Sequence, residues 1–345
     1  MTKRARPTIS EVAQAAGVSK GAVSLALNNR AGVAEETRTR ILEVSRSLGW
    51  TPNHRARALS TSRAYAVGLV IARPPETLGA DPFFPAFIAG VERILTDRGQ
   101  ALVLQVVPNQ RTETASYRRL AADGRVDGLF LLDLRIADRR IRLLKSLRLP
   151  VVTVGRPDVA SPFPAVLVDD RQAIAETVTH LVELGHEHIA YVAGPNDFLH
   201  GATRRAAWEA ALAANALPPG PCLESDFSAS DGASATRALL NSDDPPTAIV
   251  YANDVMAIAG LTVARECGVD VPGELSITGF DDTELAAHVS PGLTSVRSDP
   301  FGWGRAAART LLDLIDGKRA VDVEMPPARL VVRASTAPAH RRRAH

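Results

Sequence analysis

The chain has 345 residues, 46% of them hydrophobic, which is enough for several globular units with buried cores. Its apolar runs fall well short of the roughly 18 residues that a membrane span needs, and the basic N-terminus lacks the apolar segment of a signal peptide. Cys222 and Cys267 are the only cysteines, so no disulfide framework or paired-cysteine metal site is expected. These features exclude a membrane protein and a disulfide-rich secreted protein, and favour a soluble cytoplasmic protein.

The formal net charge of +2 is unevenly distributed along the chain. Residues 1–63 contain 11 Lys and Arg against 4 Asp and Glu, whereas residues 64–337 contain 26 against 34. A basic head on an acidic body predicts that the head contacts a polyanion such as nucleic acid. A merely solvated charged surface is the alternative.

Three short helices are expected in the basic head. Thr8 and Glu11 have the spacing of a capping box at the start of the first helix, and Gly17 can end that helix in the left-handed conformation. Ser19 then caps a second helix after a turn of about three residues. A third helix should end near Gly49, with an inward face formed by Thr37, Ile41, Val44 and Leu48.

The second helix of the head has two distinct faces. Its packing face contains Val23, Ala26 and Leu27. The opposite, free face carries Lys20, Gly21, Ser24, Leu25 and Asn28. Two helices, a tight turn with glycine and a free face on the second helix are typical of a DNA-reading helix-turn-helix. A three-helix packing unit without DNA contact is the alternative.

From Thr8 through Ser19 and Lys20 to Trp50, the head resembles the headpiece of the lactose-repressor (LacI) family. The resemblance implies that Lys20, Gly21 and Leu25 face base edges in the major groove of operator DNA. Leu25 stands where many members of the family carry a hydrogen-bonding side chain, and it can offer only an apolar contact, for instance to a thymine methyl group. The full set of DNA contacts expected in the head is Thr8, Ser19, Lys20, Gly21, Ser24, Leu25 and Asn28.

The segment that follows the head, residues 53–63, is basic and has Leu59 as its only large apolar residue. Such a segment cannot build a core, and its folding would be coupled to binding a partner. The resemblance implies a hinge helix on DNA, with contacts from Asn53, Arg55 and Arg57 and with Leu59 wedged into the minor groove. A flexible basic tether is the alternative.

The rest of the chain alternates apolar runs with amphipathic helical stretches. The expected strands are 66–72, 101–107, 128–132 and 151–154, followed by a second series at 189–193, 248–251 and 275–280. This alternation is typical of parallel sheets covered by helices, and two series of it predict two lobes.

The body resembles the periplasmic-binding-protein-like sensor of the same family, through segments such as LGHEHIAYVAGP (184–195) and YANDVMAIAG (251–260). The resemblance implies an α/β two-lobed sensor joined to an N-terminal all-α helix-turn-helix domain. The expected limits are 1–52 for the headpiece, 53–63 for the hinge, 64–166 with 297–325 for the N-terminal lobe, 167–296 with 326–337 for the C-terminal lobe, and 338–345 for a basic tail.

A ligand site is expected between the lobes, because open parallel sheets bind ligands beyond the carboxyl ends of their strands. Carried over by position from the family, the effector site contains Phe83, Arg204, Phe227, Asn253 and Asp281, and Phe198 and His200 are expected to line the same cleft. These side chains suit a polyhydroxylated effector, a sugar or a nucleoside-like compound. Asp254 is as readily a helix cap as a ligand contact.

Two other classes of function were weighed. An enzyme could use the neighbouring aspartates at 169–170, 243–244 and 281–282, the GxGxxA pattern at 302–307, or a metal held by the histidines at 180, 186 and 188. Neighbours in sequence usually point apart and a lone GxGxxA is weak, so no catalytic residue, cofactor or metal is expected. A solute-binding protein would share the body but would need export and would not carry the head.

The sequence therefore predicts a non-enzymatic, cytoplasmic transcriptional repressor. Its expected partners are double-stranded operator DNA, a small-molecule effector and a second copy of the chain in a homodimer, with no membrane contact. Effector binding between the lobes would change DNA affinity through the hinge.

Overall fold

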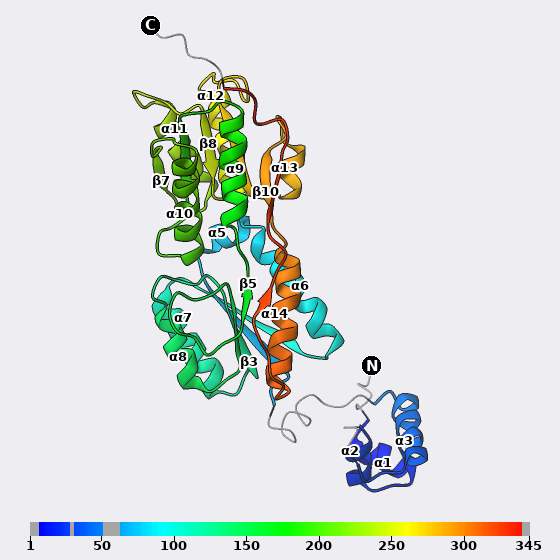
Figure 1. Cartoon of the computed structure of the whole chain (residues 1–345). Helices are drawn as coiled ribbons and strands as arrows, with labels where there is room; N and C mark the ends of the chain where they lie inside the picture. The colour runs from blue at the N-terminus through cyan, green and yellow to red at the C-terminus, as the bar shows by residue number, and fades with distance from the viewer. Residues whose placement is uncertain (1–6, 28–30, 51–62, 340–345) are drawn as a thin grey trace. The chain divides into compact units, whose positions relative to one another are not determined.

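The computed structural model describes residues 7–27, 31–50 and 63–339, and the chain divides into two compact units between Ala64 and Tyr65 (Figure 1). The first unit is the helical head and the second is the α/β body. None of the described helices has the length and apolar character needed to cross a membrane.

Within its described residues the head contains three helices, α1 (Ile9–Ala16), α2 (Lys20–Leu27) and α3 (Glu35–Ser47). The capping box of α1 is confirmed, because the Thr8 hydroxyl accepts a hydrogen bond from the backbone of Glu11 while the Glu11 carboxylate accepts one from the backbone of Thr8. Gly17 ends α1 at a φ of 68°, a left-handed conformation that glycine adopts without strain. The Ser19 hydroxyl accepts a hydrogen bond from Ala22 at the start of α2.

A small apolar core holds the three helices together. Its fully buried members are Val12, Ala13, Ala16, Val23, Ala26 and Ile41. The prediction that Leu48 faces inward is wrong, since its side chain is 39% exposed. The reason is that α3 ends at Ser47, Leu48 becomes its C-cap, and the chain then reverses at Gly49 so that Trp50 packs against the core instead.

The first lobe of the body is a six-stranded, fully parallel sheet with strand order β11-β5-β4-β3-β1-β2. Its elements are β1 (Ala66–Ala72), α5 (Pro75–Ala80), α6 (Phe83–Asp97), β2 (Ala101–Val107), α7 (Gln110–Ala122), β3 (Gly128–Leu131), α8 (Arg139–Leu147), β4 (Val151–Val154), β5 (Ala165–Leu167), α14 (Pro300–Ile315) and β11 (Val323–Glu324). Helices α6 and α14 cover one face of the sheet, and α7 and α8 cover the other.

The second lobe is another six-stranded sheet, ordered β12-β10-β9-β8-β6-β7, in which only β12 runs antiparallel to its neighbour. Its elements are α9 (Arg171–Glu183), β6 (Ile189–Ala193), α10 (Leu199–Ala214), β7 (Cys222–Glu224), α11 (Ala229–Leu240), β8 (Ala248–Tyr251), α12 (Asp254–Glu266), β9 (Ser276–Asp281), α13 (Glu284–His288), β10 (Thr294–Arg297) and β12 (Arg329–Val331). Helix α9 packs with α10, and α11 packs with α12.

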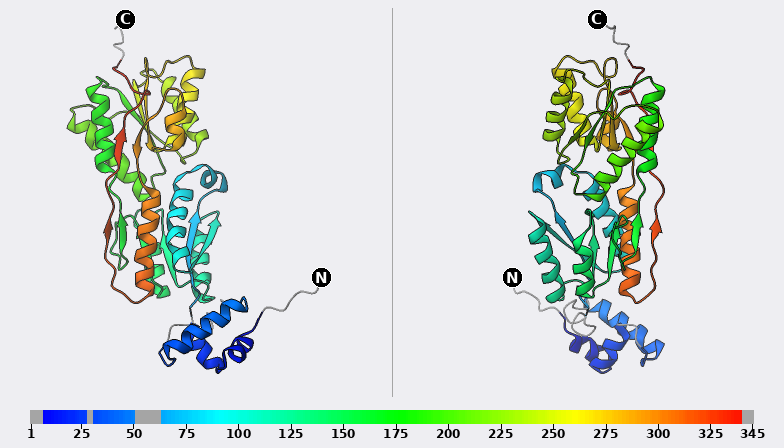
Figure 2. Two further views of the ribbon diagram at one scale, coloured as in Figure 1. Left: turned by 90° about the vertical axis from the view of Figure 1, so that its right-hand side faces the viewer. Right: turned by 60° about the vertical axis from the view of Figure 1, so that its left-hand side comes forward.

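The chain passes between the two lobes three times, after β5, after β10 and after β11. This is why α14, near the C-terminus, lies in the same lobe as β1 (Figure 1). Figure 2 shows the two lobes, each a sheet with helices on its faces, from two further directions. All seven strands expected from the apolar runs are confirmed within one residue at each end, and a two-lobed α/β body is confirmed with them.

Two glycines allow α6 and α14 to approach closely. A Cβ atom on Gly90 would lie 2.0 Å from the carbonyl oxygen of Phe301, and one on Gly304 would lie 2.1 Å from the carbonyl oxygen of Phe87. Glycine is required at both positions because no side-chain carbon fits against the facing backbone. Gly304 belongs to the GxGxxA pattern, so that pattern serves helix packing at the interior of α14.

Candidate effector cleft and DNA-reading helix

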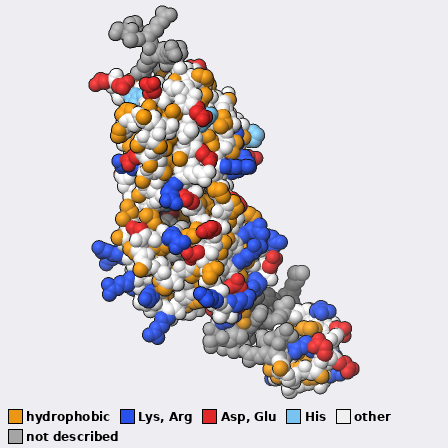
Figure 3. Space-filling model, viewed as in Figure 1, with side chains coloured by type: hydrophobic (Ala, Val, Ile, Leu, Met, Phe, Trp, Pro, Cys, Tyr) orange, Lys and Arg blue, Asp and Glu red, His pale blue; other side chains and the backbone are white. Residues whose placement is uncertain are grey.

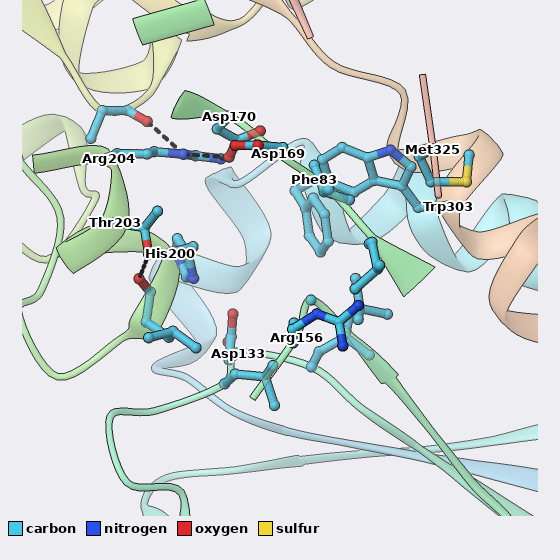
Figure 4. Close-up of a pocket in the computed structure, with 18 of the residues that line it drawn as sticks. Phe83, Asp133, Arg156, Asp169, Asp170, His200, Thr203, Arg204, Trp303 and Met325 are labelled. Atoms are coloured by element: carbon cyan, nitrogen blue, oxygen red, sulfur yellow. Dashed lines mark hydrogen bonds and ion pairs between the residues drawn. The ribbon is translucent and has the colours of Figure 1, made fainter. Parts of the chain in front are cut away.

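A cavity of about 750 Å³ lies in the body between the two lobes, and Figure 4 shows side chains from both lobes around it. The structure brings together six of the seven residues expected at the effector site, and these are Phe83, His200, Arg204, Phe227, Asn253 and Asp281. They come from the carboxyl ends of strands and from the helices or loops that follow them. This position and size are those of a ligand cleft in an open α/β protein.

Phe198, the seventh expected residue, does not line the cavity but lies directly behind its wall. Its ring stacks on His200 with centroids 5.6 Å apart, and His200 stacks on Phe227 at 5.7 Å. The guanidinium carbon of Arg73 lies 4.0 Å from the centroid of the Phe198 ring. Phe198 therefore supports the cavity wall from behind instead of facing a ligand.

Arg204 is held rigidly at the cavity wall, as Figure 4 shows. Its Nε donates to Asp170 Oδ2 at 2.8 Å, and its second guanidinium nitrogen lies 2.7 Å from the same oxygen. Its guanidinium carbon lies 3.6 Å from the centroid of the Phe280 ring. The other carboxylate oxygen of Asp170 is buried without a hydrogen-bond partner among the described residues. The charge pair thus presents a fixed donor and an acceptor to the cleft.

A second charge pair comes from the first lobe. Arg73 Nε donates to Asp133 Oδ2 at 2.8 Å, and the two residues follow the neighbouring strands β1 and β3. Although burial opposes the charged form, the Arg73 guanidinium lowers the pKa of Asp133 to about 2. Asp133 is therefore a carboxylate at every physiological pH and can accept hydrogen bonds from a ligand.

Asn253 shapes the wall through hydrogen bonds of its own. Its side-chain oxygen accepts a hydrogen bond from the backbone of Met256 and caps α12, while its side-chain nitrogen donates to the Phe227 carbonyl at 3.0 Å. The neighbouring Asp254 does not line the cavity, and it accepts hydrogen bonds from the Ser295 hydroxyl and the Thr283 backbone. Burial raises the pKa of Asp254 to about 6, although these hydrogen bonds oppose the rise.

Asp281 ends β9 with a φ of 111°, a strained conformation for a residue with a side chain. Its carboxylate accepts no hydrogen bond from any described residue. Burial, together with the nearby carboxylates of Asp81 and Asp254, raises the pKa of Asp281 well above its ordinary value. Asp281 is half-buried, and a partly desolvated carboxyl group without a partner is destabilising unless a ligand supplies one.

His200 stands between the aromatic rings and the charged groups of the cleft. Burial and the neighbouring Arg204 cation lower the pKa of His200 to about 3. Its imidazole is therefore neutral at physiological pH and offers one N–H donor and one acceptor.

The opposite end of the cleft is apolar. Phe83 and Trp303 lie with their ring centroids 5.8 Å apart, and Met325 is beside them in Figure 4. Aromatic faces at one end and charged groups at the other match the two kinds of surface on a sugar ring, which has apolar C–H faces and a polar hydroxyl rim.

The sequence analysis missed several residues that line the cleft, including Arg73, Asp81, Asp133, Arg156, Asp170 and Trp303. Four of these follow the strands β1, β3, β4 and β5 within three residues. The rule that open parallel sheets bind ligands beyond the carboxyl ends of their strands would have indicated these four residues.

The face of α2 that was expected to read DNA is accessible to solvent in part, among the residues of the head that the structure describes. Lys20 and Gly21 are exposed, whereas Ser24 and Leu25 are half-buried. Thr8 and Ser19 are exposed and act as helix caps. Asn28, and the hinge residues Asn53, Arg55, Arg57 and Leu59, lie outside the described residues.

The features that could have indicated an enzyme have structural roles. In the pair at 169–170 the neighbours bind different partners, since Asp169 pairs with Arg171 and Asp170 with Arg204. In the pair at 281–282, Asp282 pairs with Arg297 and Arg333 and does not share these partners with Asp281. His186 binds Thr247, Ser276 and the Ala337 carbonyl. Among the described residues no group of three or more His, Cys, Asp or Glu is placed to hold a metal ion.

The fold and the cleft together define a class of protein: a two-lobed ligand sensor joined to a helix-turn-helix reader. Comparison with known proteins agrees. Residues 8–53 match the family described as bacterial regulatory proteins, lacI family, and residues 178–336 match the periplasmic binding protein-like domain.

Full-length relatives carry the same arrangement. The chain is 34% identical over 330 residues to the HTH-type transcriptional regulator CelR of Thermobifida fusca, covering 94% of this chain and 96% of CelR. The structure of the CelR–cellobiose complex aligns with a TM-score of 0.73 and 32% identity over 96% of this chain and 100% of that one. The crystal structure of the lac repressor dimer bound to operator and the anti-inducer ONPF aligns with a TM-score of 0.83 and 27% identity, again over 96% and 100%.

The chain belongs to the LacI family of bacterial regulatory proteins. It is a DNA-binding transcriptional regulator with a periplasmic-binding-protein-like effector domain, as the sequence predicted.

Proposed function

We propose that this regulator is a repressor whose operator affinity is set by a sugar bound between the two lobes. The observation that carries the proposal is the partnerless Asp281 carboxyl beside the fixed Arg204–Asp170 pair, facing an aromatic end formed by Phe83 and Trp303. Hydroxyl groups of a sugar would donate to Asp281 and accept from Arg204, and its C–H faces would pack on the rings. The structure of the relative CelR contains cellobiose, which supports a sugar as the ligand of this cleft.

In the proposed DNA complex, α2 lies in the major groove. Lys20 is exposed at its start and would donate to guanine O6 and N7, while the half-buried Leu25 would contact a thymine methyl group. Thr8, Ser19, Gly21, Ser24 and Asn28 would complete the contacts to bases and phosphates. Residues 53–63 would form the hinge, with Asn53, Arg55 and Arg57 on the DNA and Leu59 in the minor groove.

The proposed assembly is a homodimer that pairs through the body, so that two heads read the two half-sites of a pseudo-palindromic operator. Leu104 and Val106 of the edge strand β2 and Leu285 of α13 are large apolar side chains exposed on the body, and an interface would bury them. The lac repressor dimer, a structural relative, supports this state. The lobe and hinge limits given above belong to the same proposal, as do a cytoplasmic location and the lack of enzymatic activity.

A ligand screen tests the proposal. The full chain is heated with cellobiose, maltose, other neutral sugars and nucleosides, and the melting temperature is recorded, because a ligand that binds the folded state raises it by mass action. We expect one or more sugars to raise it for the wild type and not for Asp281→Ala, which removes the acceptor oxygens, while the variant still binds operator DNA. Stabilisation by nucleosides alone, or an equal response of the variant, would contradict the sugar proposal.

A further inference from the structure

A second hollow, of about 460 Å³, opens on the body and shares no lining residue with the effector cleft. It lies at the starts of α7 and α8 and along the loop that precedes α8, all in the first lobe. Asp197, from the loop after β6, contributes one wall from the second lobe. The hollow is within the size range of small-molecule sites and touches both lobes.

The floor of this hollow is a buried network of two acids and two arginines. Glu113 is 1% exposed, and its two oxygens accept hydrogen bonds from Arg140 at 2.5 Å and Arg135 at 2.9 Å. Asp138 is 4% exposed, and its two oxygens accept hydrogen bonds from the Arg140 side chain and from the backbone of Arg135 and Arg140. Each oxygen of the two carboxylates therefore already accepts a hydrogen bond from an arginine, and the two acids are neutralised within the network.

The donors at the hollow exceed the acceptors. Arg135 is only 9% exposed, and its buried Nε has no acceptor among the described residues. Arg118 and Arg139 are exposed at the rim and form no ion pair with the part of the chain that the structure describes. Asp197 is the exposed carboxylate on the opposite wall. Figure 3 shows Lys and Arg side chains gathered along the edge of the body over α7 and α8.

We propose that this hollow is an anion site that takes a small molecule carrying phosphate groups. Guanidinium groups bind phosphate oxygens in a planar, two-point geometry, and Arg118 and Arg139 are available for it at the rim. Deeper in the hollow, an acceptor oxygen from the ligand would also interact with the Arg135 guanidinium, which donates to Glu113 but whose Nε has no acceptor among the described residues.

The position of the site links it to the arrangement of the lobes. Ile136 N donates to the Asp197 carbonyl at 3.1 Å, and Leu199 N donates to the Leu134 carbonyl at 2.7 Å, so a short backbone bridge joins the two lobes at the wall of the hollow. An anion beside this bridge changes the free energy of the lobe arrangement that the effector cleft also depends on. This link rests on the proposed function, whereas the anion site itself does not.

Calorimetric titration of the full chain with pyrophosphate, at constant ionic strength set with sodium chloride, tests the site. We expect saturable binding to the wild type, and affinity at least about tenfold lower for the double variant R118Q/R139Q, since it loses both charge-assisted contacts at the rim. Asp197→Asn removes the opposing negative charge and should tighten binding. Arg142→Gln, an exposed change on α8 outside the hollow, is the matched control and should bind as the wild type does.

Absence of saturable binding, or equal affinity of the wild type and R118Q/R139Q, would overturn the proposal. A failure here is distinguishable from a failure of the sugar proposal, because R118Q/R139Q leaves the effector cleft and the head intact and should keep its sugar and operator affinities. Since all the exchanged residues are exposed, each variant should fold as the wild type does.

Discussion

Arg204 and Asp281 line the same cleft, but Arg204 is paired within the protein and Asp281 is not. Arg204 is fixed by Asp170 and by the ring of Phe280, so its direction is set before a ligand arrives. Asp281 has no partner and a raised pKa, so a ligand that donates to it relieves an unfavourable burial. Arg204 is therefore preorganised for the ligand, whereas Asp281 contributes a favourable free energy that appears only when the ligand binds.

Arg204→Lys should lower effector affinity about tenfold or more, which is about 1.4 kcal/mol. A lysine ammonium cannot hold Asp170 through two guanidinium nitrogens or lie flat over the Phe280 ring, so the pair loses its fixed direction. Affinity is measured by calorimetry with a sugar that binds the wild type. Arg205→Lys, the adjacent exchange on the exposed side of α10, is the control and should change little, because Arg205 forms only a surface pair with Glu209.

His200→Phe should alter how stability depends on pH. The folded-state pKa of His200 is lowered to about 3 from an ordinary value of 6.5, so below pH 6.5 the unfolded chain takes up a proton that the folded chain does not. The wild type therefore loses up to about 1.4 kcal/mol per pH unit from this group as the pH falls from 6.5 toward 3.

The measurement is the melting temperature of both proteins between pH 7.5 and 5. The melting temperature of the variant should rise relative to that of the wild type as the pH falls. A constant difference across this range would show that His200 is not held neutral by its surroundings.

At the scale of elements, α6 and α14 pack with their backbones in direct contact at Gly90 and Gly304. Gly304→Ala places a methyl group about where the Phe87 carbonyl oxygen lies, so the two helices must separate. We expect a loss of about 1 to 3 kcal/mol, as for other overpacked cores, and a lower melting temperature. Gly79→Ala in α5 is the control, because a Cβ there meets no atom within 4 Å. Equal melting temperatures for the two variants would contradict the close packing.

The elements themselves were largely predictable from the sequence, because each expected strand is an apolar run with turn residues at its ends. The side-by-side position of α6 and α14 was not, since it joins segments far apart in the chain. The GxGxxA pattern of α14 can be recognised in the sequence. Its role in helix packing depends on Phe87, which lies against Gly304 only in the folded protein. Leu48 was misassigned because helical periodicity was extended one residue past the actual end of α3.

At the site, the sequence placed most of the cleft residues but not their roles. Asn253 was expected to bind the effector, and the structure shows both ends of its amide holding α12 and Phe227. Phe198 was expected at the cavity surface and lies behind it, because His200 on the next helix takes that place. In both cases the side chain differs from its expected role by the thickness of one layer of side chains at the cavity wall. The spacing of residues in the sequence does not specify position that finely.

At the scale of the whole molecule, the body is built so that a ligand can act on the arrangement of its lobes. Two of the three passages of the chain between the lobes, those after β5 and after β11, run along the cleft, where Val168, Asp169, Asp170 and Met325 line the cavity. A ligand that contacts both lobes favours one relative orientation, and any DNA-binding arrangement that depends on this orientation gains or loses the same free energy.

Operator affinity with and without saturating sugar is the most direct test of this account. Fluorescence anisotropy of a labelled operator duplex, at one fixed salt concentration, gives the dissociation constant of the full chain in both states. We predict a change of roughly 5- to 150-fold for the wild type, corresponding to a coupling of about 1 to 3 kcal/mol, and none for Asp281→Ala. An operator affinity that is unchanged when the cleft of the wild type is saturated would contradict the account.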